Sequence, residues 1–451
     1  MTVTYKKQRC YPIPQRILIN SLKKIFIILM ILALAFTFSF ALYKDVISVI
    51  FLATAAVILL IMMPSLVMIR KKDVIVLVLI GTILLASLLN MSSFRLGSFM
   101  YMILYILYYY CFIKLLDSNV FSINSYIKLI KTIVVTYFFV LIIQQVMAII
   151  GFEFVFNHIA SEPEKFRLNS LATEPSYAAR ILVVAMISLM TVRGIEKGRN
   201  FRYSDMFFDK FIWLLFLYQI LTLCSGFGYM LLIILMLKFS RLKTGAITFA
   251  ALTLLIYAGI EMEIEALIRV KGTFIAFFTF DPKEIIAADP SASLRILPTM
   301  AYIQDFASDS AKIWLGYGID YARSYIPTVV PFIPEDSFQG GVMPVFMFDM
   351  GLINTLLMIY MVAKNALIKL VSIDTLILII CVGAAPFSSQ LFWFCMIMYT
   401  VNKYFVKKYN LLESKSHNET VRFRWRPKSM LRMRGLRTDL PHFIHSNGCK
   451  P

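Results

Sequence analysis

The residues best suited to chemistry lie in a short segment between two apolar runs, Arg167-Leu-Asn-Ser-Leu-Ala-Thr-Glu174-Pro-Ser. Arg167 and Glu174 stand immediately before an apolar run that predicts a membrane helix. A charge at a membrane boundary costs free energy unless it is solvated, paired or bound to a ligand, so both residues are functional candidates. The alternative is an interfacial ion pair that orients the following helix.

Three arginines are candidate ligands for a phosphate group. Arg167 precedes the apolar run, Arg180 lies just inside it, and Arg295 stands within another run of apolar character. A guanidinium group binds phosphate oxygens through two parallel hydrogen bonds and keeps its charge near lipid. A site that handles a diphosphate at the outer face of a membrane would need such groups. Arg269 and Arg323 fit interfacial anchors better.

Three carboxylates, Glu174, Glu335 and Asp336, could act as bases on a sugar hydroxyl. Asp320 fits a turn residue after Gly316-Tyr-Gly318. The sequence contains no P-loop, no dinucleotide fingerprint and no Ser/His/Asp triad motif. Its six cysteines and four histidines form no cluster with metal-ligand spacing, so we expect neither a metal nor another cofactor.

The composition is that of a helical membrane protein. The chain is 59% hydrophobic and only 16% charged, with a mean hydropathy of +0.76. Repeated apolar runs are long enough to cross a hydrocarbon layer of about 30 Å as helices. The formal net charge of +19 is concentrated in the termini and in the short connections between spans, which is typical of cytoplasmic loops rather than of nucleic-acid binding.

Charge placement decides how two ambiguous regions cross the membrane. Residues 211–239 and 373–400 could each form one long helix, or two short ones broken at Ser225-Gly-Phe-Gly228 and at Ala384-Ala-Pro-Phe-Ser-Ser389. Two short helices put basic residues inside and segment 261–340, with eleven Asp and Glu against six Lys and Arg, outside. The sequence therefore predicts twelve spans with both termini in the cytoplasm.

The predicted fold class is an all-α polytopic membrane protein of about twelve transmembrane helices, with a large extracytoplasmic loop that contains amphipathic helices. We expect a cytoplasmic N-terminal segment at 1–23 and a single transmembrane domain at 24–400 with outer loops 152–174 and 261–340. The basic tail, 401–451, is expected in the cytoplasm against anionic lipid headgroups.

One helix of the second outer loop can be placed from its start signal. Asp289 and Pro290 precede an apolar-periodic run that reaches about Phe306. This pattern predicts a helix with Asp289 as its N-cap and Pro290 in its first turn. We expect it to lie on the outer membrane face.

Three short motifs resemble elements of the Wzy-type O-antigen polymerases and the related O-antigen ligases. The twelve predicted spans and the two outer loops, of which the second is larger, fit the same family. The likeness covers roughly residues 130–365 in pattern, and the other spans match in hydropathy alone. The motifs are Arg167-x6-Glu174-Pro-Ser176, Trp314-Leu-Gly-Tyr-Gly-Ile-Asp320 and Phe348-Asp-Met-Gly-Leu-Ile353.

The resemblance implies a GT-C-like membrane glycosyltransferase in the bacterial inner (plasma) membrane. It would transfer a growing glycan from undecaprenyl diphosphate onto a sugar hydroxyl of the next lipid-linked repeat unit, at the outer face. By analogy, Arg167 and Arg295 hold the diphosphate leaving group, and Glu174 or the Glu335–Asp336 pair orients or deprotonates the acceptor. The implied partners are the undecaprenyl-diphosphate-linked oligosaccharide, the lipid bilayer, a flippase and a chain-length regulator.

Two alternatives stay open. An O-antigen ligase would carry a histidine shortly before the Gly-Leu-Ile element and Ser-Arg-Gly at the earlier helix break. This chain has no histidine between Phe332 and Met350 and has Ser225-Gly-Phe at the break, which favours a polymerase. A secondary transporter or flippase of lipid-linked sugars would suit twelve spans, but the sequence has no paired half-repeats.

Overall fold

The computed structural model describes residues 13–36, 74–91, 94–151, 168–238, 281–288, 290–305, 310–329 and 341–424, with single positions between 261 and 278. Within these ranges the chain forms helices and connecting turns, and no strand. Close packing unites residues 1–406, and residues 407–451 form a second unit. The expected N-cap Asp289 and most of the predicted outer loop 152–174 lie outside the described residues.

Five of the described helices are long and apolar enough to cross a membrane. This confirms the helical membrane class. The five are α1 (Ile13–Ala35), α4 (Leu96–Leu116), α5 (Ile123–Ile150), α6 (Pro175–Glu196) and α15 (Val342–Asn365). Shorter apolar helices join them: α3 (Val74–Leu89), α7 (Lys210–Thr222), α8 (Gly226–Leu237) and α16 (Ile373–Gly383). The last helix is α17 (Gln390–Arg424).

Both ambiguous regions divide into two helices, as the sequence predicted. The break between α7 and α8 ends at Ser225, whose hydroxyl caps α8 by accepting from the Gly228 amide at 3.3 Å. The break between α16 and α17 contains Pro386, which has no amide hydrogen to continue a helix. The hydroxyl of Ser389 then accepts from the Phe392 amide at 3.3 Å.

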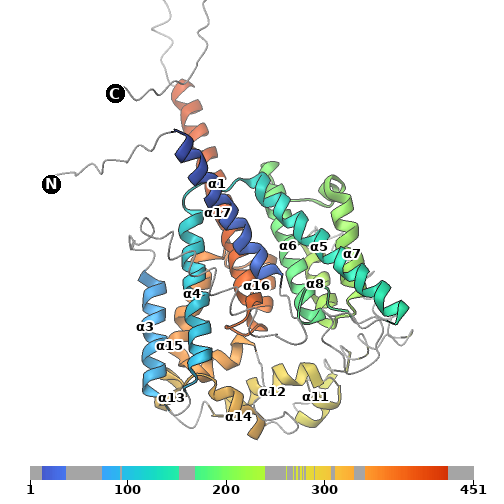
Figure 1. The fold of residues 1–451 in the computed structure, drawn as a ribbon, viewed down its shortest axis with the longest axis vertical. Coiled ribbons are helices and arrows are strands. Elements are labelled where there is room, and N and C mark those ends of the chain that lie inside the picture. Colours follow the sequence, from blue (N-terminus) through green and yellow to red (C-terminus); the bar gives the residue numbers. More distant parts are fainter. Residues whose placement is uncertain are drawn as a thin grey trace, which may run out of the picture. The chain divides into compact units, whose positions relative to one another are not determined.

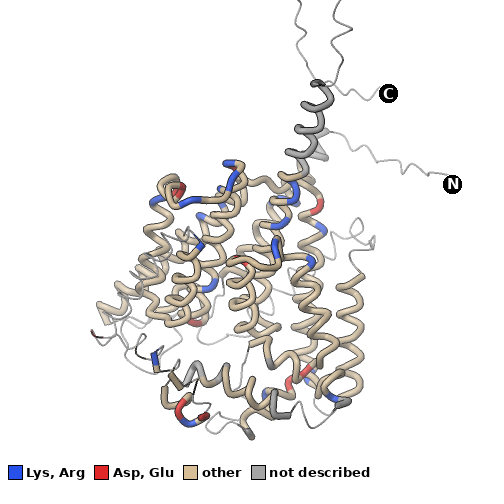
Figure 2. The backbone as a smooth tube through the Cα atoms, turned by 180° about the vertical axis from the view of Figure 1, so that it is seen from behind, with Lys and Arg blue, Asp and Glu red and all other residues tan. Residues whose placement is uncertain are grey.

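Contacts between helix ends, including that of Gly228 with Ala179, show that α5, α6, α7 and α8 alternate in direction (Figure 1). Asp209, at the start of α7, binds Lys131 near the start of α5 and Arg193 near the end of α6. We call this the basic end, because Lys and Arg gather there in Figure 2. At the opposite end, the beginning of α6 meets the end of α16, where Arg180 donates to the Ala384 carbonyl at 3.0 Å.

Tyrosines on the apolar helices connect the bundle. Because lipid tails are as apolar as leucine, helices in a membrane associate largely through close packing and interhelical hydrogen bonds. Four buried phenol groups supply such bonds between α1, α4, α5 and α17. They join Tyr108 to the Met30 carbonyl at 2.7 Å, Tyr137 to the Ala35 carbonyl at 2.6 Å, Tyr109 to the Thr400 hydroxyl at 2.8 Å and Tyr126 to Asn402 at 3.1 Å.

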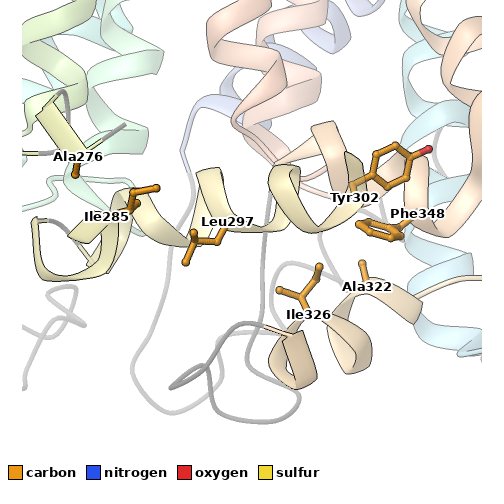
Figure 3. Close-up of a cluster of buried hydrophobic side chains, with 7 residues drawn as sticks. All are labelled: Ala276, Ile285, Leu297, Tyr302, Ala322, Ile326 and Phe348. Atoms are coloured by element: carbon orange, nitrogen blue, oxygen red, sulfur yellow. The ribbon is translucent and has the colours of Figure 1, made fainter. Parts of the chain in front are cut away.

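Between α8 and α15, the described residues form four short helices. They are α11 (Pro282–Ala288), α12 (Pro290–Asp305), α13 (Ser310–Leu315) and α14 (Tyr321–Val329). The helix predicted from Pro290 to about Phe306 is thus confirmed as α12, which lies across the ends of the long helices (Figure 1). An apolar cluster joins α11, α12 and α14 to α15 (Figure 3). In it, the rings of Tyr302 and Phe348 meet edge to face, with centroids 4.4 Å apart.

Candidate functional site

Ser176 connects Glu174 and Arg180, the two described residues of the predicted site whose side chains the structure places. Glu174 is exposed at the N-cap position of α6, and Pro175 follows in the first turn. The Ser176 hydroxyl donates to the Glu174 carboxylate at 3.1 Å and accepts from an Arg180 Nη at 3.4 Å. The α6 N-terminus also favours a negative charge at this position.

Arg180 is fully buried and joins three helices. Its Nε donates to the Ser176 carbonyl at 3.2 Å, and its Nη1 donates to the carbonyl of Ala384 at the end of α16. The guanidinium also lies over the rings of Tyr177, at 4.7 Å, and Phe227, at 4.6 Å. These contacts make Arg180 a link between α6, α8 and α16. Its role as a diphosphate ligand stays a prediction.

The second and third sequence motifs meet backbone to backbone. Gly316 (φ +82°) and Gly351 (φ +76°) both adopt left-handed conformations that other residues rarely tolerate. A Cβ atom on Gly316 would lie 2.6 Å from the Gly351 nitrogen. The amides of Tyr317 and Gly318 donate to the carbonyls of Phe348 and Asp349 at 2.8 and 2.9 Å. We call this contact the glycine junction.

Two carboxylates lie at the glycine junction. Asp349 is nearly buried, and its Oδ1 accepts from the Ala322 amide at 2.9 Å. Asp320 has a left-handed backbone (φ +64°), and its carboxylate accepts a short hydrogen bond from the hydroxyl of Ser98 at the start of α4. The Asn90 side chain, after α3, donates to the Gly316 carbonyl at 3.2 Å. The junction therefore collects α3, α4, α14 and α15 at one place.

Sequence reasoning identified the motifs of the junction but not its chemistry. Asp320 was interpreted as a turn residue, which its left-handed conformation fits, and Asp349 appeared only as part of a motif. Ser98 and Asn90 carried no signal, because each lies more than two hundred positions from its partner in the chain. The glycines next to each aspartate were the usable sign, since paired glycines often mark close backbone approach.

The other predicted site residues are placed only in part. Arg167, Glu335 and Asp336 lie outside the described residues, and Arg295 is on α12 without a described side chain. The convergence of Arg167 and Arg295 therefore stays a prediction. Within the described part of the chain, no group of three or more His, Cys, Asp or Glu side chains is arranged to hold a metal ion.

The basic end is organised by two buried aspartates between α6 and α7. Burial raises the pKa of Asp209, but hydrogen bonds from Arg193 and Lys131 outweigh it and hold the pKa below its usual value. The same balance lowers the pKa of Asp205, which binds Lys197 and Arg199. Both aspartates are therefore ionised at neutral pH and fix the basic side chains around them.

Comparisons of the chain with protein-family models, with curated proteins and with solved structures found no match. The fold and its candidate spans define the class, an α-helical membrane protein.

Proposed function

We propose that this protein is a polysaccharide (O-antigen) polymerase of the Wzy type. It transfers a growing glycan from undecaprenyl diphosphate onto the next lipid-linked repeat unit, at the outer face of the bacterial inner membrane. The observation that carries the proposal is the glycine junction. If the motifs that resemble this family serve one site, they should lie together, and the second and third motifs do.

The proposed reaction needs groups for a leaving diphosphate and for an acceptor hydroxyl. The acceptor oxygen forms a bond to the anomeric carbon of the donor glycan, and the bond from that carbon to the diphosphate oxygen breaks. Arg167 and Arg295 stabilise the charge on the departing undecaprenyl diphosphate. A carboxylate among Glu174, Glu335 and Asp336 takes the hydroxyl proton. Arg180 supports the first motif through Ser176.

The proposed topology has twelve spans, cytoplasmic termini and outer loops at 152–174 and 261–340. It is supported by the alternating helices and by the charges of the basic end (Figure 2). The glycine junction and Glu174 belong to the opposite end, which faces outward in this topology. A lipid-linked substrate that has crossed the membrane would reach them there.

The glycan profile of a deletion strain separates the polymerase from its alternatives. Loss of a polymerase leaves surface glycan capped with a single repeat unit, because export and ligation continue. Loss of a ligase leaves long chains on undecaprenyl diphosphate, and loss of a flippase leaves single units on the cytoplasmic side. We expect the first result, restored to a full ladder by the wild-type gene. A ladder of normal length in the deletion strain would exclude the polymerase.

A further inference from the structure

A buried glutamine stands in the apolar helix α5. Gln144 has no exposed surface and belongs to a helix that is a candidate membrane span. A primary amide in such a place is unfavourable unless its donor and acceptor atoms are satisfied. Gln144 satisfies them with the segment that connects α5 to α6.

Among the described residues, the Gln144 amide makes three hydrogen bonds, all with one turn. Its Oε1 accepts from the Ser170 amide at 2.7 Å, and its Nε2 donates to the Ser170 carbonyl and to Asn169 Oδ1, both at 3.1 Å. The amide thus binds both polar backbone groups of Ser170. Ser170 has a left-handed backbone (φ +52°), which a non-glycine residue keeps only where its surroundings hold it.

Further contacts fix the rest of the turn inside the bundle. The Ser170 hydroxyl donates to the Tyr137 carbonyl at 2.6 Å, and Asn169 Nδ2 donates to the Thr173 carbonyl at 3.3 Å. Leu168, Leu171 and Ala172 are buried. The segment from Leu168 to Thr173 is therefore packed against α5 rather than lying free at the surface.

The two charged residues of the first motif flank this segment. Arg167 is bonded to Leu168, and Glu174 is bonded to Thr173. We propose that Gln144 is a positioning residue that fixes Glu174 at the start of α6 through the Asn169–Ser170 turn. The effect on glycan transfer rests on the proposed function, whereas the clamping of the turn does not.

Replacing Gln144 with leucine keeps a similar volume and removes all three bonds. The Ser170 amide and carbonyl then lose their partners in an apolar surrounding, so the turn should open more often. If the motif works as proposed, polymer formation should fall by about 100-fold, because small misplacements of catalytic groups cost factors of that order.

The chain offers two matched controls. Gln145 is the next residue on α5, but it accepts from the Tyr218 hydroxyl at 2.6 Å and not from the turn. Gln219 is as buried as Gln144, but its amide donates to the helix carbonyls of Val134 and Leu215. Gln145→Leu controls for the position and Gln219→Leu for the loss of a buried amide.

The clamp is tested by adding a cysteine, Ala172→Cys, to the full-length protein in membranes and measuring the extra maleimide label by mass. We expect slow labelling in the wild-type, Gln145→Leu and Gln219→Leu backgrounds, and at least about tenfold faster labelling with Gln144→Leu. If Gln144→Leu does not accumulate in membranes, Asn169→Ala, which removes the bond to Gln144 and the bond to the Thr173 carbonyl, is read in the same way. Equal labelling rates in all backgrounds would overturn the clamp.

The second readout is the polymer formed per unit of membrane protein when each variant complements the deletion strain. We expect the Gln144→Leu loss of about 100-fold, with both control variants near wild type. Wild-type polymer from Gln144→Leu with a fast-labelled turn would overturn the positioning role while leaving the polymerase in place. A normal ladder in the deletion strain itself would exclude the polymerase function but would not contradict the role of Gln144 in holding the turn.

Discussion

At the scale of single residues, the glycine junction is possible because Gly316 and Gly351 each carry only a hydrogen atom as a side chain. Any side chain on Gly316 or Gly351 would meet the backbone of the other segment, and both residues have positive φ angles. Backbone atoms cannot rotate aside as a flexible side chain can. The junction therefore requires glycine at both positions, for conformation and for space.

We expect Gly351→Ala to destabilise the protein by at least about 1–3 kcal/mol from backbone strain alone, and to shorten the glycan ladder sharply. Gly81→Ala is the control, because Gly81 lies in α3 with open space around its Cα and should be neutral or slightly stabilising. Thermal unfolding in detergent and the ladder of complemented strains measure the two effects. Wild-type behaviour of Gly351→Ala would show that the junction is not required.

The arginines make the second prediction at this scale. Arg167→Ala or Arg295→Ala should reduce polymer formation by at least about 100-fold with normal protein levels, since each removes charge stabilisation of the leaving group. Lysine should rescue poorly, because one ammonium cannot replace a two-pronged guanidinium. Arg323→Ala, in the predicted outer loop that also contains Arg295, should retain activity. An active Arg295→Ala protein would remove Arg295 from the site.

At the scale of elements, the sequence predicted what local chemistry determines. Pro386 accounts for the break between α16 and α17, and α12 follows from Pro290 and an apolar period. The break between α7 and α8, where Cys224 has a φ of +45°, was predicted from charge placement rather than from a local backbone signal. The glycine junction and the partners of Arg180 were not predicted. They depend on contacts between distant segments, such as Arg180 with Ala384, and no local pattern encodes those.

Asp209 unites three elements, and its removal should therefore cost more than that of an exposed acid. Asp209→Asn should lower the free energy of unfolding at pH 7 by about 3 kcal/mol, because it leaves Arg193 and Lys131 without their buried partner. Glu196→Gln removes the other carboxylate bound to Arg193, at the surface, and should cost under about 1 kcal/mol. Thermal unfolding in detergent gives both values.

The loss of unfolding free energy caused by Asp209→Asn should depend on pH, and the direction follows from the sign of the Asp209 pKa shift. The folded-state pKa of Asp209 is lowered, so its contribution is fully present above the unfolded-state pKa of about 4 and is lost as the pH falls through the folded-state value. The difference in unfolding free energy between wild type and Asp209→Asn should stay constant from pH 8 to about 5 and become smaller only in more acidic solution. A gap that narrows near pH 6 would contradict the assignment.

At the scale of the whole molecule, the unit formed by residues 1–406 has two chemically different ends. Lys and Arg gather at the basic end (Figure 2), where buried Asp205 and Asp209 order them. The opposite end holds Glu174, Asp320 and the glycine junction. Cytoplasmic loops of membrane proteins are enriched in Lys and Arg, so this asymmetry predicts which end faces which compartment.

Cysteine accessibility tests that orientation directly. Ser204, at the basic end, and Ser324, on α14, are both exposed. In intact spheroplasts, Ser324→Cys should add one label from a membrane-impermeant maleimide, whereas Ser204→Cys should add one only after the membrane is permeabilised. The physical reason is that the charged reagent cannot cross the bilayer, and the predicted orientation puts the basic end on the cytoplasmic side. Labelling of Ser204→Cys but not Ser324→Cys in intact cells would mean that the protein has the opposite orientation in the membrane. The proposed reaction at the outer face would then be wrong.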